Sequence, residues 1–214
     1  MLKKFSEFIE EGMWGSALRR SNTGEERRES VNTQYIDLGL PSGTLWADRN
    51  IGATEPEDEG DFYAWGEIEP KKEYTRDNYK WGKNATKYND KDGKTVLDPE
   101  DDVVYLKTKG KAHIPTKEQI RELLNNTITK NKTINGVTGK LYKSNINGNT
   151  IFIPFSGDWF FSSGAIHPWS RSCSSSIDSS NRHKVLYLFS SCNNCGIGEL
   201  DCYDGFSVRG VKDK

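Results

Sequence analysis

The residues with the greatest capacity for chemistry are four cysteines, which all lie in the last quarter of the chain. Cys192 and Cys195 form a Cys-x-x-Cys pair, and Cys173 and Cys202 lie on either side of it. Four thiolates can bind zinc, but Cys173 and Cys202 are too far apart to form the second half of a zinc knuckle. A redox Cys-x-x-Cys pair usually lies at a helix N-terminus, and the glycine-rich sequence after Cys195 does not predict a helix. We therefore predict no metal and no cofactor, and we keep a cysteine-dependent metalloprotein or enzyme as an alternative.

The other titratable residues form no catalytic or metal-binding pattern. His113, His167 and His183 are far apart in the sequence, and each is expected to be a surface or capping histidine. The acidic runs 55–59 and 98–102 lack calcium-loop spacing and are expected to be solvated loops. No phosphate-binding loop, nucleophile elbow or paired-carboxylate site is recognisable, so we predict that the protein is not an enzyme.

Composition and charge limit the class of protein further. The chain has 214 residues, of which 34% are hydrophobic and 11% aromatic, and this aromatic content favours a folded domain over disorder. The formal net charge of -1 provides no basic surface for nucleic acid or for an anionic membrane. No apolar stretch is long enough to span a membrane, and Glu7, Glu10 and Glu11 lie where a signal peptide needs an apolar core. We predict no nucleic-acid partner, no membrane insertion and no signal peptide.

Residues 1–32 differ from the rest of the chain and are predicted to be an N-terminal docking segment or tether. Leu2, Phe5, Phe8 and Ile9 recur at helical spacing, whereas the sequence from Arg19 to Ser30 is almost entirely polar. One interpretation is a frayed amphipathic N-terminus that packs on its own domain. The other is a docking peptide through which residues 1–30 contact a larger assembly or another copy of the chain.

Residues 33–214 are predicted to form one α+β domain with few helices, short antiparallel strands and long loops. Pro41-Ser42-Gly43 interrupts an alternating stretch and predicts a hairpin, and residues 60–67 contain a short aromatic strand. Residues 67–95 are polar and are expected to form a long excursion. The acidic residues 98–102 precede an apolar run at 103–106 and predict the start of a helix.

The clearest helix is predicted over residues 114–124. Thr116 and Gln119 form a capping-box pattern, and Ile120, Leu123 and Leu124 make one apolar face. Strands are then expected at 139–145, 149–156 and 185–190, with a hairpin turn at Gly148-Asn149 between the first two, and a last strand at 205–211.

The strand at 185–190 alternates, but its periodicity does not decide which residues face the core. Either Leu186 and Leu188 lie inside, or Val185, Tyr187 and Phe189 do.

Several motifs occur in the order found in a known family. They are YIDLGLPSGTLWADRNIGA, GDFYAWGE, LDPEDDVVYL, IPTKEQIRELL, NTIFIPFSG, PWSRS and GFSVRGV. Over residues 34–211 the chain resembles a paralogous domain of gut Bacteroidetes and their phages, which has the C-type-lectin and formylglycine-generating-enzyme fold. It departs from that family at three places. Residues 110–113 replace a Trp-rich stretch before the helix, Ile120 replaces a Trp or Phe within the helix, and Gly210 replaces the Pro of the last strand. The N-terminal sequence also resembles leader segments of phage proteins.

Some members of this family are variable proteins of diversity-generating retroelements, in which adenines of Asn codons are replaced. Such replacement cannot produce Lys, Glu, Gln, Trp or Met, and residues 170–183 contain none of these five. Between 185 and 209 Glu199 is the only one. If residues 170–204 are a diversified segment, codon variation would also explain why the four cysteines occur together, and they would need no chemical role. Ordinary serine-rich loop composition could produce the same pattern.

The resemblance implies that Leu186 and Leu188 lie in the core and that Tyr187 and Phe189 point outward. Exposed aromatic side chains beside small polar ones are typical of a paratope. The alternative is that Tyr187 and Phe189 belong to the core. The predicted ligand-binding residues are Trp169, Ser170, Arg171, Cys173, Asn181, Arg182, His183, Tyr187, Phe189, Cys192, Asn193, Asn194, Cys195, Asp201, Cys202, Tyr203 and Asp204.

The leading hypothesis is a non-catalytic adhesion or receptor-recognition protein, encoded by a phage or prophage, whose ligand is a protein or glycan on a bacterial surface. Its expected location is the virion, or the host cytoplasm before assembly, with residues 1–30 docking to the virion or to another copy. One alternative is an undiversified structural or interaction domain, and the other is the cysteine-dependent protein described above. A reverse-transcriptase gene beside a template repeat that differs only at adenines would distinguish the first hypothesis from the others.

Overall fold

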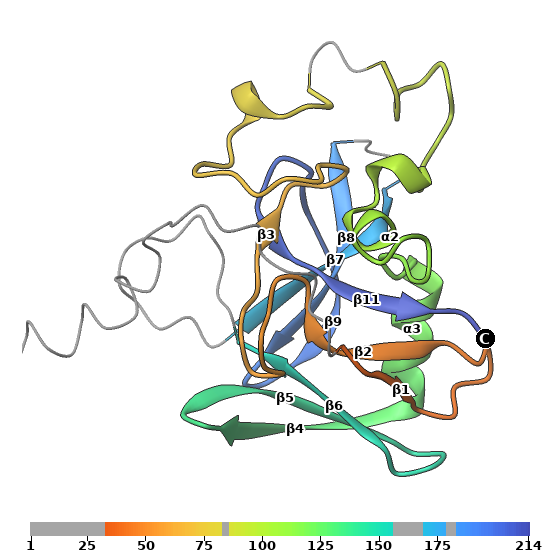
Figure 1. Cartoon of the computed structure of the whole chain (residues 1–214), viewed down its shortest axis with the longest axis vertical. Helices are drawn as coiled ribbons and strands as arrows, with labels where there is room; N and C mark the ends of the chain where they lie inside the picture. The colour runs from red at the N-terminus through yellow and green to blue at the C-terminus, as the bar shows by residue number, and fades with distance from the viewer. Residues whose placement is uncertain (1–32, 83–85, 156–168, 179–182) are drawn as a thin grey trace, which may run out of the picture.

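The computed structural model describes residues 33–82, 86–155, 169–178 and 183–214. Within these residues the chain has few helices and mostly antiparallel strands in three sheets, which confirms the α+β class. In Figure 1 the polar excursion lies at the top, above the sheet that contains β2, and the sheet of β4, β5 and β6 lies at the bottom. The predicted docking segment at 1–32 lies outside the described residues, as do His167, Asn181 and Arg182.

The first sheet begins with the predicted hairpin. β1 (Tyr35–Asp37) pairs antiparallel with β2 (Leu45–Asn50), and the Gly43 N–H donates to the Leu40 carbonyl oxygen at 2.8 Å across the turn. Gly43 has a φ of +79°, a conformation that glycine adopts without the steric clash of a Cβ atom. The hairpin prediction is therefore confirmed.

The predicted last strand is wrong in one respect, because the structure divides it between two sheets. β10 (Phe206–Ser207) lies in the five-stranded sheet, and β11 (Arg209–Lys212) pairs with the edge of β2 opposite β1. Arg209 fixes the crossing point: its fully buried guanidinium donates to Asn50 Oδ1 at 2.8 Å and to the Ala47 carbonyl oxygen at 3.0 Å. Strand periodicity cannot reveal that a chain changes sheet at a buried residue.

The five-stranded sheet has the order β3-β10-β7-β8-β9 and carries most of the predicted binding residues. Its members are β3 (Phe62–Tyr63), β10, β7 (Trp169–Ile177), β8 (Lys184–Ser191) and β9 (Cys195–Asp201). β8 and β9 form a regular antiparallel hairpin with register from Lys184 opposite Asp201 to Ser190 opposite Cys195. The pairing of β10 with β7 is parallel, and the other pairings are antiparallel.

The serine-rich segment before β8 forms an internal strand. β7 lies between β10 and β8, and Ser172, Ser174, Ser175 and Ser176 are buried. We expected residues 170–204 to form one binding surface, and this expectation is wrong for these serines. Sequence composition could not reveal this burial, because serine is mostly exposed in proteins and is favoured in turns.

The third sheet contains β4 (Thr127–Ile134), β5 (Val137–Ser144) and β6 (Thr150–Pro154), in that order. The β5–β6 hairpin around Gly148-Asn149 is confirmed. β4 was not predicted, because it is an exposed edge strand with polar residues on both faces and no alternation of hydrophobicity.

Two short helices cover the sheets. Asp102 caps α2 (Val103–Lys107), and its carboxylate accepts from the N–H groups of Val104 and Tyr105. α3 (Lys117–Asn126) has the predicted capping box between Thr116 and Gln119, and Ile120 and Leu123 are fully buried. The 3-10 turns η2 (Arg76–Asn78) and η3 (Pro99–Asp101) lie in or after the excursion.

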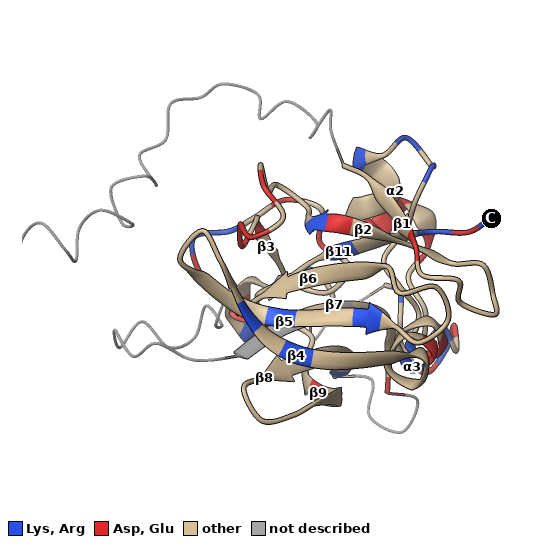
Figure 2. Ribbon diagram, turned by 90° about the horizontal axis from the view of Figure 1, so that it is seen from below, with Lys and Arg blue, Asp and Glu red and all other residues tan. Residues whose placement is uncertain are grey.

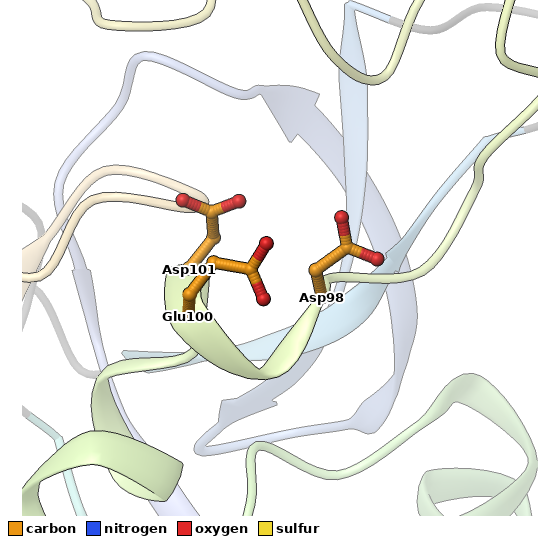
Figure 3. A group of neighbouring side chains, drawn as sticks. All are labelled: Asp98, Glu100 and Asp101. Atoms are coloured by element: carbon orange, nitrogen blue, oxygen red, sulfur yellow. The ribbon is translucent and has the colours of Figure 1, made fainter.

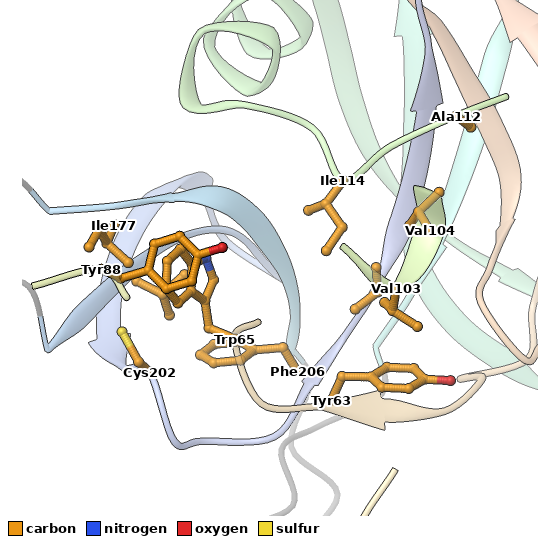
Figure 4. Close-up of a cluster of buried hydrophobic side chains, with 12 residues drawn as sticks. Tyr63, Trp65, Tyr88, Val103, Val104, Ala112, Ile114, Ile177, Cys202 and Phe206 are labelled. Carbon is orange, nitrogen blue, oxygen red and sulfur yellow. The ribbon is translucent and has the colours of Figure 1, made fainter. Parts of the chain in front are cut away.

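Two hydrophobic clusters pack on opposite faces of the five-stranded sheet. Figure 4 shows the first, in which Trp65, shortly after β3, and Tyr88 of the excursion meet Phe206, Cys202 and α2. The second contains Trp46, Ile120, Tyr142 and Leu188, from β2, α3, β5 and β8. β8 is therefore buried on both faces over part of its length, with Val185 in the first cluster and Leu188 in the second.

Candidate ligand-binding face

The central feature of the candidate face is a pair of aromatic rings that lie over glycines. Tyr187 and Phe189 of β8 are opposite Gly198 and Gly196 of β9, and both rings are partly exposed. A Cβ atom at Gly196 would lie 2.9 Å from the Phe189 ring, and one at Gly198 would lie 2.8 Å from the Tyr187 ring. Aromatic side chains commonly cover cross-strand glycines in this way. We call these two rings and two glycines the aromatic platform.

The other face of β8 lies in the core, as predicted. Leu186 and Leu188 are 4% and 1% exposed, whereas Tyr187 and Phe189 are only partly buried. Tyr187 also contacts Phe206, with ring centroids 5.8 Å apart. Tyr187 also packs against the first hydrophobic cluster, in which Val185 from the same side of β8 is fully buried. The expectation that this side points outward is therefore only partly correct.

Polar residues gather where β8 begins and β9 ends. Lys184 Nζ lies 2.7 Å from Asp201 Oδ1, and Tyr203 donates to Asp201 Oδ2 at 3.0 Å. The hydrogen bond to Asp201 raises the pKa of Lys184. His183 is exposed and Asp204 is partly exposed beside this group. Four predicted residues, His183, Asp201, Tyr203 and Asp204, therefore lie together at one end of the hairpin.

Cys202 lies between these residues in the sequence but belongs to the core. Its side chain is 3% exposed in the first hydrophobic cluster, and burial raises the pKa of its thiol to about 12. The prediction that Cys202 is part of a binding surface is therefore wrong. β9 ends at Asp201, and the Cys202 carbonyl oxygen accepts a hydrogen bond from the Trp65 N–H at 2.9 Å.

The opposite end of the hairpin is the turn Cys192-Asn193-Asn194. Asn193 and Asn194 are exposed, and Cys192 and Cys195 are partly exposed. Two residues of the third sheet support this turn: Asn131 Nδ2 donates to the Cys192 carbonyl oxygen at 2.9 Å, and Lys140 Nζ lies 3.4 Å from the same oxygen. Sequence reasoning missed Asn131 and Lys140, because only the tertiary packing brings β4 and β5 to the turn.

Apart from the buried Cys202, the predicted residues whose side chains the structure describes form three groups along one hairpin and not a single patch. The platform lies between the polar group near His183 and the turn near Asn193. For Trp169, Ser170, Arg171 and Cys173 the structure describes the backbone of β7 but not the side chains. Register places Arg171 opposite Phe189 and Cys173 opposite Tyr187, so these two positions flank the platform in the sheet.

An acidic cluster outside this face is the main candidate for a cation site among the described residues. Figure 3 shows Asp98, Glu100 and Asp101, with carboxylate oxygens within 4.8 Å of one another. Lys87 Nζ already lies 3.1, 2.5 and 3.0 Å from these three carboxylates, respectively. Lys87 thus supplies a positive charge shared by all three carboxylates, and Lys80 and Lys94 add ion pairs to Asp101 and Asp98.

This cluster also corrects the expectation that residues 98–102 form a solvated loop. Asp101 and Asp102 are 2% and 5% exposed. Burial by itself would raise the pKa of Asp101, but hydrogen bonds from Lys80, Lys87 and Tyr88 outweigh it and lower that pKa. For Asp102 burial is dominant and raises the pKa, although three backbone N–H groups donate to the carboxylate. Each of these two buried carboxyl groups has specific hydrogen-bond donors.

His113, expected to be a surface or capping histidine, is partly buried and links two segments. Its Nε2 lies 3.1 Å from Asp213 Oδ2, and its Nδ1 lies 2.9 Å from the Ile114 carbonyl oxygen.

Figure 2 shows basic residues on β4 and β5 and acidic residues at other positions, including α3.

Comparisons with models of known protein families, with curated proteins and with solved structures found no match to this chain. In the part of the chain that the structure describes, no helix is both long and apolar enough to cross a membrane.

Proposed function

We propose that this protein is a non-catalytic ligand-binding protein with a C-type-lectin-like fold, and that the aromatic platform is the centre of its binding face. The platform is the observation that supports this proposal. Phe and Tyr side chains provide large contact area at low cost in conformational entropy, and they are enriched at binding hot spots. Here two such rings lie side by side at partial exposure, with centroids 6.5 Å apart.

The surroundings of the platform support the same function. Adaptable polar groups lie at both ends of the hairpin, with Asp201 and Tyr203 at one and Asn193 and Asn194 at the other. β9 is the edge of its sheet, so the platform lies at a border of the five-stranded sheet. Rigid rings flanked by small polar side chains match the composition of paratopes.

The source and ligand class belong to the same proposal. The motif order supports a diversified phage or prophage protein, as does the scarcity of Lys, Glu, Gln, Trp and Met over residues 170–209, where only Lys184 and Glu199 occur. Its ligand is a protein or glycan of a bacterial surface, and its location is the virion. The few helices, short antiparallel strands and long excursion are compatible with the C-type-lectin-like fold.

The test measures binding of the labelled full chain to intact cells of a panel of gut Bacteroidetes strains, by flow cytometry. We expect the double variant Tyr187→Ala/Phe189→Ala to bind at least about tenfold more weakly to strains that the unaltered protein binds, since hot-spot residues contribute about 2 kcal/mol or more. Gly196→Ala and Gly198→Ala keep both rings but displace them, and each should weaken binding to a smaller degree.

Ile128→Ala and Ile146→Ala are the matched controls. Both side chains are exposed, at 61% and 54%, and lie outside the β8–β9 hairpin. Circular dichroism and thermal melting verify that every variant is folded. Equal binding by the folded platform variants and the unaltered protein would contradict the proposal.

A further inference from the structure

The β8–β9 turn brings two cysteines to the same end of one hairpin. The Ser191 N–H donates to the Asn194 carbonyl oxygen at 2.7 Å, and the Asn194 N–H donates to Ser191 Oγ at 3.1 Å. The chain reverses direction between these residues. Cys192 follows Ser191 and Cys195 follows Asn194, so the two cysteines precede and follow Asn193 and Asn194 in the chain. We call residues 192–195 the tip.

The turn is held from below at the backbone of Cys192. Its carbonyl oxygen accepts from Asn131 Nδ2 at 2.9 Å and lies 3.4 Å from Lys140 Nζ, which in turn donates to Asn131 Oδ1 at 2.8 Å. Lys140 is 4% exposed and has no carboxylate partner among the described residues. The buried ammonium and the amide therefore fix the position of Cys192 against β4 and β5.

The second thiol is close to the same support. Cys195 Sγ lies 3.8 Å from Thr129 Oγ1, and Ser190, the residue opposite Cys195, shares a hydrogen bond of 2.6 Å with Tyr142. Both ends of the tip are therefore anchored to the third sheet, whereas Cys192 and Cys195 remain partly exposed. Cys202 differs in being buried, which makes it a built-in comparison for thiol reactivity.

We propose that Cys192 and Cys195 form a closely spaced dithiol that closes to a disulfide across the tip when it meets a low-molecular-weight disulfide such as glutathione disulfide. The thiolate of one cysteine attacks a sulfur of glutathione disulfide, and the first glutathione thiolate leaves. The second cysteine loses its proton, and its thiolate attacks the protein sulfur of the mixed disulfide and expels the second glutathione. Two protein thiols are oxidised, one glutathione disulfide is reduced to two glutathiones, and the protein loses two hydrogens.

The closed form would restrict the tip that carries Asn193 and Asn194. A disulfide joins residues whose Cα atoms are about 4.4–6.8 Å apart, so closure holds the two ends of the tip at that separation. Closure of the disulfide does not depend on the ligand, and it would occur even if the aromatic platform did not bind one.

The first experiment treats the full chain with excess glutathione disulfide and maps the cysteines by mass spectrometry of proteolytic peptides. We expect a product lighter by two hydrogens with Cys192 linked to Cys195, and Cys202 unmodified. Cys192→Ser and Cys195→Ser should instead stop at a glutathione adduct, and Cys202→Ser should behave as the unaltered protein. A lasting glutathione adduct on the unaltered protein, a link to Cys173, or no reaction would overturn the proposal.

A second measurement tests the spacing of the thiols without oxidation and without a variant. Phenylarsine oxide binds two thiols only when they are close together, so the reduced full chain should bind it at Cys192 and Cys195. We expect prior treatment with glutathione disulfide to abolish this binding and dithiothreitol to restore it. Absence of arsenical binding by the reduced, folded protein would show that the sulfurs are too far apart and would overturn the proposal.

Discussion

At the scale of single residues, Lys87 has the most consequential position outside the candidate face. Its ammonium contacts Asp98, Glu100 and Asp101, and Tyr88 Oη donates to Asp101 Oδ2 at 2.8 Å. A hydrogen bond from Lys94, assisted by Lys87, lowers the pKa of Asp98, and a hydrogen bond from Lys87 lowers that of Glu100. Lys87 thereby joins the excursion to η3 at a point where three carboxylates would otherwise repel one another.

We expect Lys87→Met to lower the melting temperature at pH 7 and to have a smaller effect at pH 3. Asp98, Glu100 and Asp101 have pKa values that are lower in the folded state than in the unfolded state. Their contribution to stability is therefore complete above about pH 4–4.5 and is lost as the pH falls through the folded values. Thermal melting at both pH values measures the difference.

Lys91→Met is the control for this prediction, because Lys91 is an exposed lysine of the same excursion. It should leave melting almost unchanged at both pH values. Asp102 acts in the opposite sense, since its raised pKa favours proton uptake by the folded state, but it is present in all the variants. An equal loss for Lys87→Met at pH 7 and pH 3 would contradict the assigned role.

At the scale of elements, α3 shows how a local signal and the core act together. Thr116 Oγ1 accepts from the Gln119 N–H, and Gln119 Oε1 accepts from the Thr116 N–H. Ile120 and Leu123 on the next turn pack in the second hydrophobic cluster. The capping box therefore determines where the helix begins, and the buried leucine and isoleucine determine which face it presents to the sheets.

Thr116→Ala should lower the free energy of unfolding by about 0.5–2 kcal/mol, because it removes the side-chain acceptor of the capping box. Thr116→Ser retains a hydroxyl and should restore most of the loss. Urea denaturation of both variants measures the difference. If the alanine and serine variants were equally destabilised, packing of the threonine methyl group would be responsible and not the cap.

At the scale of the whole molecule, the last strands connect parts of the chain that are far apart in sequence. β10 lies between β3 and β7, and β11 pairs with β2 and forms a bridge between Val211 and His113. Arg209 adds a hydrogen bond to the Phe152 carbonyl oxygen of β6 at 3.1 Å. The C-terminal segment thus contacts all three sheets.

We expect truncation after Asp204 to abolish cooperative unfolding, since it removes both strands and leaves the faces that they cover exposed. Deletion of residues 1–32 should preserve a cooperative transition, because these residues are predicted to be a docking segment or tether. Circular dichroism melting of the two truncated chains provides the comparison. A cooperative transition in the C-terminal truncation would contradict the role of β10 and β11, and loss of the transition in the N-terminal deletion would contradict the tether.

Predictions from sequence succeeded where the signal was local. The hairpin at Pro41-Ser42-Gly43, the capping box at Thr116 and the hairpin at Gly148-Asn149 depend on residues within a few positions of one another. Predictions failed where the burial of a residue depends on segments that are distant from it in the sequence. Asp101 resembles a solvated acid until Lys80, Lys87 and Tyr88 surround it. The serines of β7 resemble a loop until Ser172 pairs with β8 and β10, and Ser175 forms backbone hydrogen bonds with Leu97 and Pro115.

The candidate face shows the same difference between local signals and long-range packing. The alternation of residues 185–190 by itself determined that Leu186 and Leu188 share one side and that Tyr187 and Phe189 share the other. Only the tertiary structure decided how far each side is buried. Leu188 packs with α3 and β5 in the second cluster, and Val185 and Tyr187 on the other side pack in or against the first. The tertiary structure also brought Asn131 and Lys140 beneath Cys192 and placed Cys202 in the core. Strand periodicity is encoded by neighbouring residues, whereas burial and side-chain partners depend on segments that are distant in the sequence.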